Sequence, residues 1–408
     1  MEWKEVRLGD VCNIITGFPF PGKKYSKEGI RVVRGDNVTI GNLRWDTEKD
    51  KRWNEPFDKT EYYSLQANDI VIGMDGSRVG KNKARIKEED LPLLLAQRVA
   101  CVRHNELAEQ DYLYYNIFSK KFIDYVNSIH TGSAIPHISQ KQIEDYMILL
   151  PDLETQRRIA SILSSLDRKI ELNNKINADL EEMAQAIFKN WFVDFEPFKD
   201  GKFVDSELGM IPDGWKVGRL DEIADVVGGS TPSKAKPEYY TQKGIAWLTP
   251  KDLSNHPAVY TSRGEIDITE EGYNSTSTKL MPKGTILFTS RAPIGYISIA
   301  QNDICTNQGF KSLVPKKAGT CFLYCFLKYV TPEIENKSTG STFKEASGAL
   351  MKSLQVIMPE QKVFEDFEEI VCPLFARIES LEKENSRLSL LRDTLLPRLM
   401  SGELEVPE

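Results

Sequence analysis

Arginine, asparagine and glutamine side chains lie beside glycines and turns in two stretches of this 408-residue chain. These side-chain types form the bidentate hydrogen bonds that read guanine and adenine in the major groove of DNA. On residue type we select Arg34, Asn37, Arg78, Gln97 and Arg98 in the first stretch, and Arg263, Arg291, Asn307 and Gln308 in the second. The alternative for each is a solvated charge or an amide that stabilises a turn.

Lysines suit phosphates, which position a protein on DNA without specifying a sequence. The lysines that we select for this role are Lys23, Lys24, Lys81, Lys83, Lys234, Lys236 and Lys251. Four basic residues, Lys81, Lys83, Arg85 and Lys87, recur with a period of two. They would share one face of an extended strand, with Ala84 and Ile86 on the other. A solvated edge strand that uses lysine to block aggregation explains the same pattern.

Catalytic motifs are absent from the sequence. There is no Gly-x-x-x-x-Gly-Lys-Ser/Thr phosphate loop, no His-Glu-x-x-His, and no Asn-Pro-Pro-Tyr segment of amino methyltransferases. One pattern resembles a nuclease: Asp152 after Pro151, then Asp167 before Arg168-Lys169. Asp152 precedes a predicted long helix and Asp167 lies within it, facing solvent, so the two carboxylates do not converge on a metal. We expect no catalytic residues.

The six cysteines and four histidines give no metal-binding pattern. Cys321 and Cys325 are one helical turn apart, which permits a metal pair, yet no second pair completes a site. We expect reduced core thiols, no bound metal and no cofactor on this chain.

These candidate residues lie in two related sequence repeats. Trp3, Lys4, Arg7, Leu8 and Gly17 reappear 212 positions later as Trp215, Lys216, Arg219, Leu220 and Gly229. The match continues in order through Gly29 and Gly244, Gly80 and Gly295, Gln97 and Gln308, the Thr-Gly-Ser runs that begin at Thr131 and Thr339, and Pro151 and Pro359. Two related modules with different side chains between shared anchors suit one kind of recognition on two targets. As shared residues, Gln97 and Gln308 could instead stabilise the common fold.

Composition predicts two globular domains with connecting helices, because 408 residues exceed one compact core. Apolar residues make up 40% of the chain and charged ones 28%, with no run of the ~18 apolar residues that span a membrane. The first residues lack the apolar run of a secretion signal, so we expect a cytoplasmic protein. The net charge of -7 argues against a protein that coats nucleic acid alone, but permits local basic patches.

Two long segments, Leu153 to Phe195 and Glu360 to Met400, alternate charged and apolar residues with helical period. Apolar positions step by fours and threes, from Ile159 to Trp191 and from Phe367 to Leu399, which predicts a coiled-coil seam. Asn177 and Asn385 occupy matching seam positions, where a buried amide fixes the register. A slightly rotated helix, with Ile176 facing the partner, is the alternative.

Geometry predicts that these helices pair antiparallel. A 40-residue helix is ~60 Å long, and a module of about 150 residues, with a radius of gyration near ~15 Å, cannot carry the chain back along it. The predicted fold is α+β, with an internal repeat about a pseudo-twofold axis. The segments are module one (1–152), a first helix (153–196), module two (197–358), and a second helix with a tail (359–408). Such a spacer between two readers matches separated half-sites on DNA.

Three further motifs carry a resemblance to a known family. They are the run from Ala186 to Phe195, the run Ser206 to Trp215, and Leu395-Leu396-Pro397-Arg398-Leu399-Met400-Ser401-Gly402-Glu403. Together with the repeat and the paired helices, the chain resembles the specificity subunit of type I restriction-modification enzymes over its whole length. The resemblance implies a non-catalytic reader of bipartite double-stranded DNA sites, with two target recognition domains.

The resemblance also implies partners: two modification methyltransferase subunits and, in the full complex, two restriction and translocase subunits. S-adenosylmethionine, ATP and magnesium are then expected on those partners. Two alternatives remain: a structural adaptor that joins two protein partners, and a standalone metal-dependent nuclease.

Overall fold

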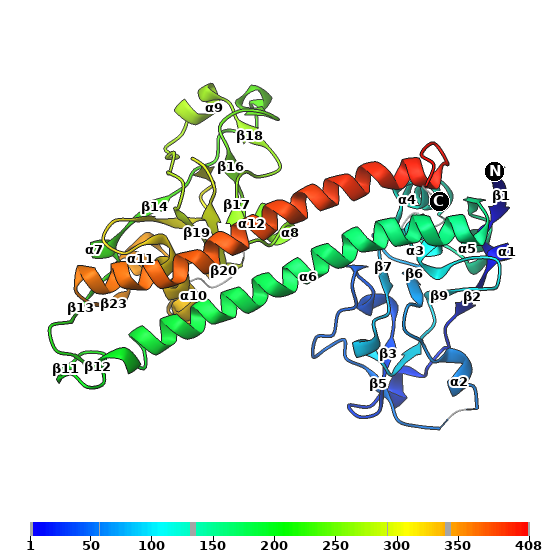
Figure 1. The fold of residues 1–408 in the computed structure, drawn as a ribbon, viewed down its shortest axis with the longest axis horizontal. Coiled ribbons are helices and arrows are strands. Elements are labelled where there is room, and N and C mark those ends of the chain that lie inside the picture. The colour runs from blue at the N-terminus through cyan, green and yellow to red at the C-terminus, as the bar shows by residue number, and fades with distance from the viewer. Residues whose placement is uncertain (1–2, 57, 131–135, 292, 339–343, 407–408) are drawn as a thin grey trace. The chain divides into compact units, whose positions relative to one another are not determined.

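The computed structural model describes residues 3–56, 58–130, 136–291, 293–338 and 344–406. The chain forms two compact units: unit 1 is Met1–Ile170 with Arg387–Glu408, and unit 2 is Glu171–Ser386. Each unit holds one module and one part of each long helix (Figure 1). The repeated runs Thr131-Gly132-Ser133 and Thr339-Gly340-Ser341 lie outside the described residues.

Module one is built on a five-stranded sheet. Its strand order is β2(Cys12–Thr16), β9(Val99–His104), β6(Ile70–Gly73), β7(Lys83–Arg85) and β4(Ile40–Gly41). Neighbouring strands are antiparallel except for the parallel pair β4 and β7. A smaller sheet joins β5(Arg52–Trp53), β3(Ile30–Val33) and β8(Leu93–Leu95), and β1(Lys4–Arg7) pairs with β10(Met147–Leu150).

Module two repeats this sheet strand for strand. The order is β14(Ala224–Gly228), β22(Lys311–Pro315), β19(Ile286–Ser290), β20(Ile294–Ala300) and β17(Tyr260–Thr261), again with a parallel last pair. Two-stranded sheets pair β13(Lys216–Arg219) with β23(Gln355–Met358), β16(Trp247–Leu248) with β21(Cys305–Thr306), β15(Tyr240–Thr241) with β18(Asp267–Ile268), and β11(Phe203–Ser206) with β12(Gly209–Pro212). The predicted internal repeat is confirmed by the shared topology.

A close backbone approach explains why one glycine recurs in both modules. A Cβ on Gly17 would lie 2.2 Å from the carbonyl oxygen of Ala96, and one on Gly229 would lie 2.1 Å from that of Thr306. No side chain fits there, because real Cβ atoms do not come this close to backbone. The shared glycines therefore report the fold that the modules have in common.

Helices cover each five-stranded sheet. In module one these are α3(Gln110–Phe118) and α4(Lys120–Ile129). They are separate helices because Ser119 is extended and its hydroxyl caps α4 by accepting the N–H of Phe122. Module two has one longer helix here, α10(Thr320–Lys337). The remaining helices are α1(Leu8–Val11), α2(Thr60–Tyr63), α5(Gln140–Glu144), α7(Leu220–Ile223), α8(Pro250–Asn255), α9(Glu270–Asn274) and α11(Gly348–Ser353), with 3-10 turns at Gly22–Lys24 (η1), Gly35–Asn37 (η2), Glu88–Asp90 (η3), Glu196–Phe198 (η4) and Pro237–Tyr239 (η5).

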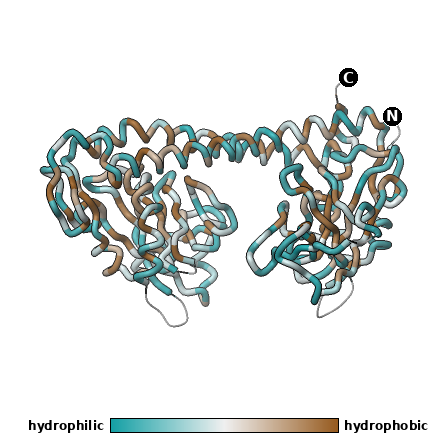
Figure 2. Tube along the Cα trace, turned by 90° about the horizontal axis from the view of Figure 1, so that it is seen from below, coloured by the Kyte–Doolittle hydropathy of each residue, from teal (hydrophilic) through white to brown (hydrophobic). Residues whose placement is uncertain are grey.

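The two long helices are α6(Leu153–Phe192) and α12(Gln361–Met400). In unit 1, Asp167 of α6 pairs with Arg392 of α12 at 2.7 Å; in unit 2, the ring of Phe188 lies 6.2 Å from that of Phe367. Because later residues of α6 meet earlier residues of α12, the helices are antiparallel, as predicted. Figure 2 shows hydrophobic residues (brown) recurring between hydrophilic ones along both helices. Within the described residues, no helix has the length and apolar character needed to span a membrane.

The two asparagines predicted for the seam have different hydrogen-bond partners. Asn385 does lie at the contact, but its partners are Asn173, which donates to Asn385 Oδ1 at 2.8 Å, and Asn174, which accepts from Asn385 Nδ2 at 2.8 Å. Asn177 is buried at 9% exposure, and its Oδ1 has no hydrogen-bond partner among the described residues. The polar contact therefore lies one helical turn before Asn177.

Candidate DNA interface

A groove of about 910 Å³ in module two gathers four of the seven polar residues selected from the sequence of that module. Its lining includes three cations, one amide and two aromatic rings: Lys234, Lys251, Arg291, Asn307, Tyr240 and Trp247. Lys234 lies in the loop before η5. The other five residues lie in β15 and β16, directly after β19 and β21, and at the start of α8. Cations around aromatic rings suit the phosphates and bases of a nucleic acid.

The aromatic rings of the groove are held in place by hydrogen bonds to backbone. Trp247 Nε1 donates to the carbonyl oxygen of Ser230 at 3.1 Å, and Tyr240 OH donates to that of Pro232 at 2.6 Å. The two ring centroids lie 5.9 Å apart. Sequence reasoning missed both rings, although each lies within a short distance along the chain of a selected lysine.

The cations of the groove are positioned by local structure. Thr249 and Asp252 form a capping box at the start of α8, with the Thr249 hydroxyl donating to Asp252 Oδ2 at 2.6 Å, and this fixes Lys251 in the first turn. Arg291 lies 3.5 Å from Glu345, and Asn307 Oδ1 accepts the N–H of Gly309 at 2.8 Å. Asn307 thus stabilises a turn, which is the alternative that the sequence offers to a base contact.

Three other selected residues of module two lie outside the groove lining. Lys236 Nζ donates to Tyr239 OH at 2.9 Å, which raises the pKa of Lys236. Arg263 pairs with Asp267 at 3.4 Å and lines a second hollow of about 500 Å³ that also includes Lys251. Gln308 is exposed, and its Oε1 accepts from the Thr231 hydroxyl.

In module one, several of the selected residues are exposed. Lys23 and Lys24 lie in η1, where Lys24 pairs with Glu55 at 2.8 Å. Arg78 and Lys81 are exposed in the turn before β7 and have no ion-pair partner within the described part of the chain. This turn therefore remains a candidate phosphate contact.

The remaining two exposed candidates, Gln97 and Arg98, form the turn between β8 and β9. Arg98 adopts a left-handed φ of 66° and donates to Asp75 at 2.7 Å, while Arg34 lies over the Tyr25 ring at 5.8 Å. Both arginines keep exposed surface but already have an internal partner.

Two selected residues are structural, which corrects the sequence prediction. Asn37 is fully buried, with Nδ2 donating to the carbonyl oxygens of Arg44 and Lys49 and Oδ1 accepting the N–H of Arg34. Lys83 is 3% exposed, and its Nζ donates to the carbonyl oxygens of Gly80 and Ile117. Neither side chain offers an atom to DNA.

The alternative interpretation, a solvated edge strand, is also wrong for β7, which lies between β6 and β4 in the sheet. Lys83 lies over the rings of Phe118 and Phe122, and burial lowers its pKa to about 7. Arg85 pairs with Asp111 and lies over the Tyr114 ring at 5.0 Å. Helices α3 and α4 cover these side chains, while Lys81 and Lys87, outside the strand, stay exposed.

The nuclease pattern has no metal-binding geometry. Asp152 caps α6 by accepting the N–H of Thr155 at 3.0 Å and its hydroxyl at 2.8 Å. Asp167 does not face solvent as predicted: it accepts from Tyr115 OH and from Arg392, each at 2.7 Å. Both carboxylates have structural roles.

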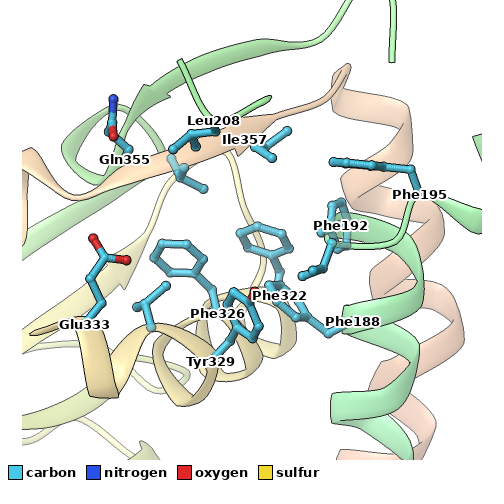
Figure 3. A pocket seen from close by; sticks show the side chains of 13 residues that line it. Phe188, Phe192, Phe195, Leu208, Phe322, Phe326, Tyr329, Glu333, Gln355 and Ile357 are labelled. Carbon is cyan, nitrogen blue, oxygen red and sulfur yellow. The ribbon is translucent and has the colours of Figure 1, made fainter. Parts of the chain in front are cut away.

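A second concavity of unit 2, shown in Figure 3, has the opposite character. This pocket of about 300 Å³ is lined by six aromatic rings, at Phe188, Phe192, Phe195, Phe322, Phe326 and Tyr329. Glu333 and Gln355 lie at its polar side (Figure 3). Such a lining favours apolar groups over phosphates.

Comparison with known proteins decides the family. A sequence model of the type I restriction modification DNA specificity domain matches residues 1–182 and again residues 212–388. The chain belongs to this family of type I specificity subunits. The two matches begin at the two modules and extend into α6 and α12.

Relatives of the specificity subunit align over about half of the chain or over nearly all of it. The MjaIX specificity subunit of Methanocaldococcus jannaschii is 40% identical over 190 residues, which are 46% of this chain and 44% of that protein. The chain thus spans less than half of that relative. The HindI specificity subunit of Haemophilus influenzae is 27% identical over 99% of this chain and 100% of its own length.

A solved structure shares the fold of this specificity subunit. The type I restriction-modification S subunit from M. genitalium has a TM-score of 0.58 at 18% identity, over 98% of this chain and 96% of that one. The predicted family and fold class are confirmed.

Proposed function

We propose that module one and module two each read one half of a bipartite DNA site, while α6 and α12 set the unread spacing between the halves. The observation that carries this proposal is the repeated sheet with a different surface on each copy, and in module two a groove with Lys234, Lys251, Arg291 and Asn307 around two rings. A reader needs a common scaffold and a variable surface.

Methylation and cleavage are assigned to partner subunits in this proposal. Two modification methyltransferase subunits dock on the helices, and two restriction and translocase subunits join in the full complex, with S-adenosylmethionine, ATP and magnesium bound by those partners. The chain itself is non-catalytic and works in the cytoplasm. Support comes from the structural roles of Asp152 and Asp167, which leave the nuclease pattern without free carboxylates.

The experiment measures DNA binding by the chain assembled with its methyltransferase subunit. Lys234→Ala or Lys251→Ala should weaken binding on all sequences and reduce the slope of log affinity against log salt by about one. Arg291→Ala should relax discrimination at one base pair, at a cost of ~1–3 kcal/mol. The control is Lys283→Ala, because Lys283 is exposed and does not line the groove.

Two outcomes would contradict the proposal. Equal salt slopes for the groove variants and for Lys283→Ala would show that the groove does not contact DNA. No site-selective binding by any assembly would favour the structural adaptor, and DNA cleavage by the chain alone with magnesium would favour the nuclease.

The spacing claim has its own test. One extra helical turn in both α6 and α12 adds ~5.4 Å, which is between one and two base pairs at ~3.4 Å each. The unread spacer in the methylated site should grow by that amount while both half-sites keep their bases. An unchanged spacer would show that the helices do not set the distance.

A further inference from the structure

Two cysteines meet at the contact between α10 and α12 within unit 2. Cys321, in the first turn of α10, and Cys372, in α12, place their Sγ atoms 3.1 Å apart. Cys321 is 3% exposed, whereas Cys372 is exposed to solvent. The pair thus combines a sheltered thiol with one that reagents can reach.

Glu368 fixes the geometry of this pair. Its carboxylate accepts the N–H groups of Cys321 at 3.2 Å and Phe322 at 2.7 Å, and it also accepts from Cys372 Sγ at 3.2 Å. The approach requires a glycine at Gly319, where a Cβ would lie 2.1 Å from the Glu368 carboxyl carbon. One side chain therefore caps α10 and holds both cysteines together.

The geometry of Cys321, Glu368 and Cys372 does not favour a bound metal ion. The three ligand atoms of Cys321, Glu368 and Cys372 lie within 4.8 Å of one another, and no fourth ligand joins them in the described residues. Two thiolates on a tetrahedral zinc, each at ~2.3 Å, sit roughly 3.7 Å apart, which is wider than the 3.1 Å seen here. Both carboxylate oxygens already accept backbone N–H groups.

We propose that Cys321 and Cys372 form a reversible disulfide that ties module two to α12, with a peroxide as the oxidant. Exposed Cys372 attacks hydrogen peroxide, giving a sulfenic acid and water, and its proton passes by way of Glu368 to the departing hydroxide. The Cys321 sulfur then displaces hydroxide from the Cys372 sulfenic acid, giving the disulfide and a second water. Two thiols and one peroxide become one disulfide and two waters.

The protonation of the buried partner fits this order. The hydrogen bond with Cys372, burial and the Glu368 carboxylate together raise the pKa of the Cys321 thiol well above its ordinary range. Cys321 therefore stays a thiol until Cys372 has been oxidised beside it. A reductant of the dithiol class restores both thiols.

The test counts thiols in the full chain. Of six free cysteines, five are buried and Cys372 is exposed. Stepwise hydrogen peroxide should remove two thiols together, peptide mapping should show a Cys321–Cys372 link, and dithiothreitol should restore both. Because the link closes a long chain loop, oxidation should raise the thermal midpoint of unfolding by roughly 5 °C.

Matched serine variants distinguish a specific Cys321–Cys372 disulfide from general thiol oxidation. Cys372→Ser should abolish the link, whereas Cys325→Ser, one helical turn beyond Cys321 and fully buried, should leave it intact. Over-oxidation of Cys372 without any link in the wild-type chain would overturn the proposal. So would one equivalent of zinc that protects both thiols and needs both cysteines, because that result identifies a metal site.

Discussion

Module one and module two share a sheet but differ in how their cations are used. The five strands have the same order, and a Cβ added to Gly17 or Gly229 would lie 2.2 or 2.1 Å from a backbone carbonyl oxygen. On module two, Lys234, Lys251 and Arg291 line one groove with Tyr240 and Trp247. The repeated positions are thus those that build the sheet, and the surfaces diverge.

In module one, some cations have internal partners, whereas Arg78 and Lys81 have no ion-pair partner in the described part of the chain. Arg31 lies over Trp45 at 5.1 Å and pairs with Asp50 at 3.3 Å, and Arg98 pairs with Asp75 at 2.7 Å. An acid that neutralises an arginine also orients it. In module two the groove cations Lys251 and Arg291 are paired in the same way, with Glu265 at 3.6 Å and Glu345 at 3.5 Å. The difference teaches that duplication preserves the scaffold while each copy acquires its own recognition chemistry.

The largest expected effect comes from exchanging a whole module. Replacing residues 1–152 with the equivalent module of a related specificity subunit should change one half of the methylated sequence completely. The half read by residues 197–358 should survive, because sites without shared partners contribute nearly additively. Methylation mapping of the chimera gives the answer, and a change in both halves would contradict the division of labour between the modules.

A single added methyl group at the shared glycine should disrupt the common sheet. Gly229→Ala should destabilise the protein by about 3 kcal/mol or more, because the new Cβ meets the carbonyl oxygens of Thr306 and Asn307. The neighbouring Gly228→Ala is the control, since its Cβ would have no atom within 4 Å. Urea denaturation measures both, and equal stabilities would show that the close approach is not needed. Gly17→Ala and Gly22→Ala repeat the pair in module one.

The sequence predicted those features that depend on local pattern. The heptad spacing predicted the helices α6 and α12 to within a few residues, and the repeat predicted two related modules, which share a sheet. Contacts between side chains that are far apart in the sequence could not be predicted from local pattern. Lys83 is buried under α3 and α4, where the carbonyl oxygen of Ile117, 34 residues later, accepts from its Nζ. Cys372 contacts Cys321 across 51 residues.

Lys81 and Lys83 are two residues apart, and they should separate a role in DNA binding from a role in stability. Lys83→Met should cost ~2 kcal/mol of stability, because two buried carbonyl groups lose their donor, while the salt dependence of DNA binding stays unchanged. Lys81→Ala should do the reverse, with stability within ~0.5 kcal/mol and a salt slope reduced by about one. Urea denaturation and binding across a salt series measure both. A reduced salt slope for Lys83→Met at unchanged stability would reinstate Lys83 as a phosphate contact.

The smallest effect concerns a carboxyl group of α12 that contacts module two and has no carboxyl counterpart at the matching position of α6. Glu382 of α12 accepts the N–H groups of Val259 and Tyr260 at 2.7 and 3.0 Å, whereas the residue 208 positions earlier is Asn174. Burial, aided by Glu181 and Glu379, raises the pKa of Glu382 to about 7 from 4.5. The folded protein therefore holds a proton that the unfolded chain releases above its ordinary pKa.

This linkage has a definite sign. Glu382 favours folding most below pH 4.5, and its contribution is lost as the pH rises through the window up to about 7. Glu382→Gln stays uncharged, so its stability should fall less between pH 5 and pH 8 than that of the wild type, by ~1–2 kcal/mol. Asn174→Gln is the matched control in α6 and should keep the wild-type pH dependence. Thermal unfolding across this range measures the difference, and parallel curves for the wild type and Glu382→Gln would show that Glu382 is already ionised in the folded protein.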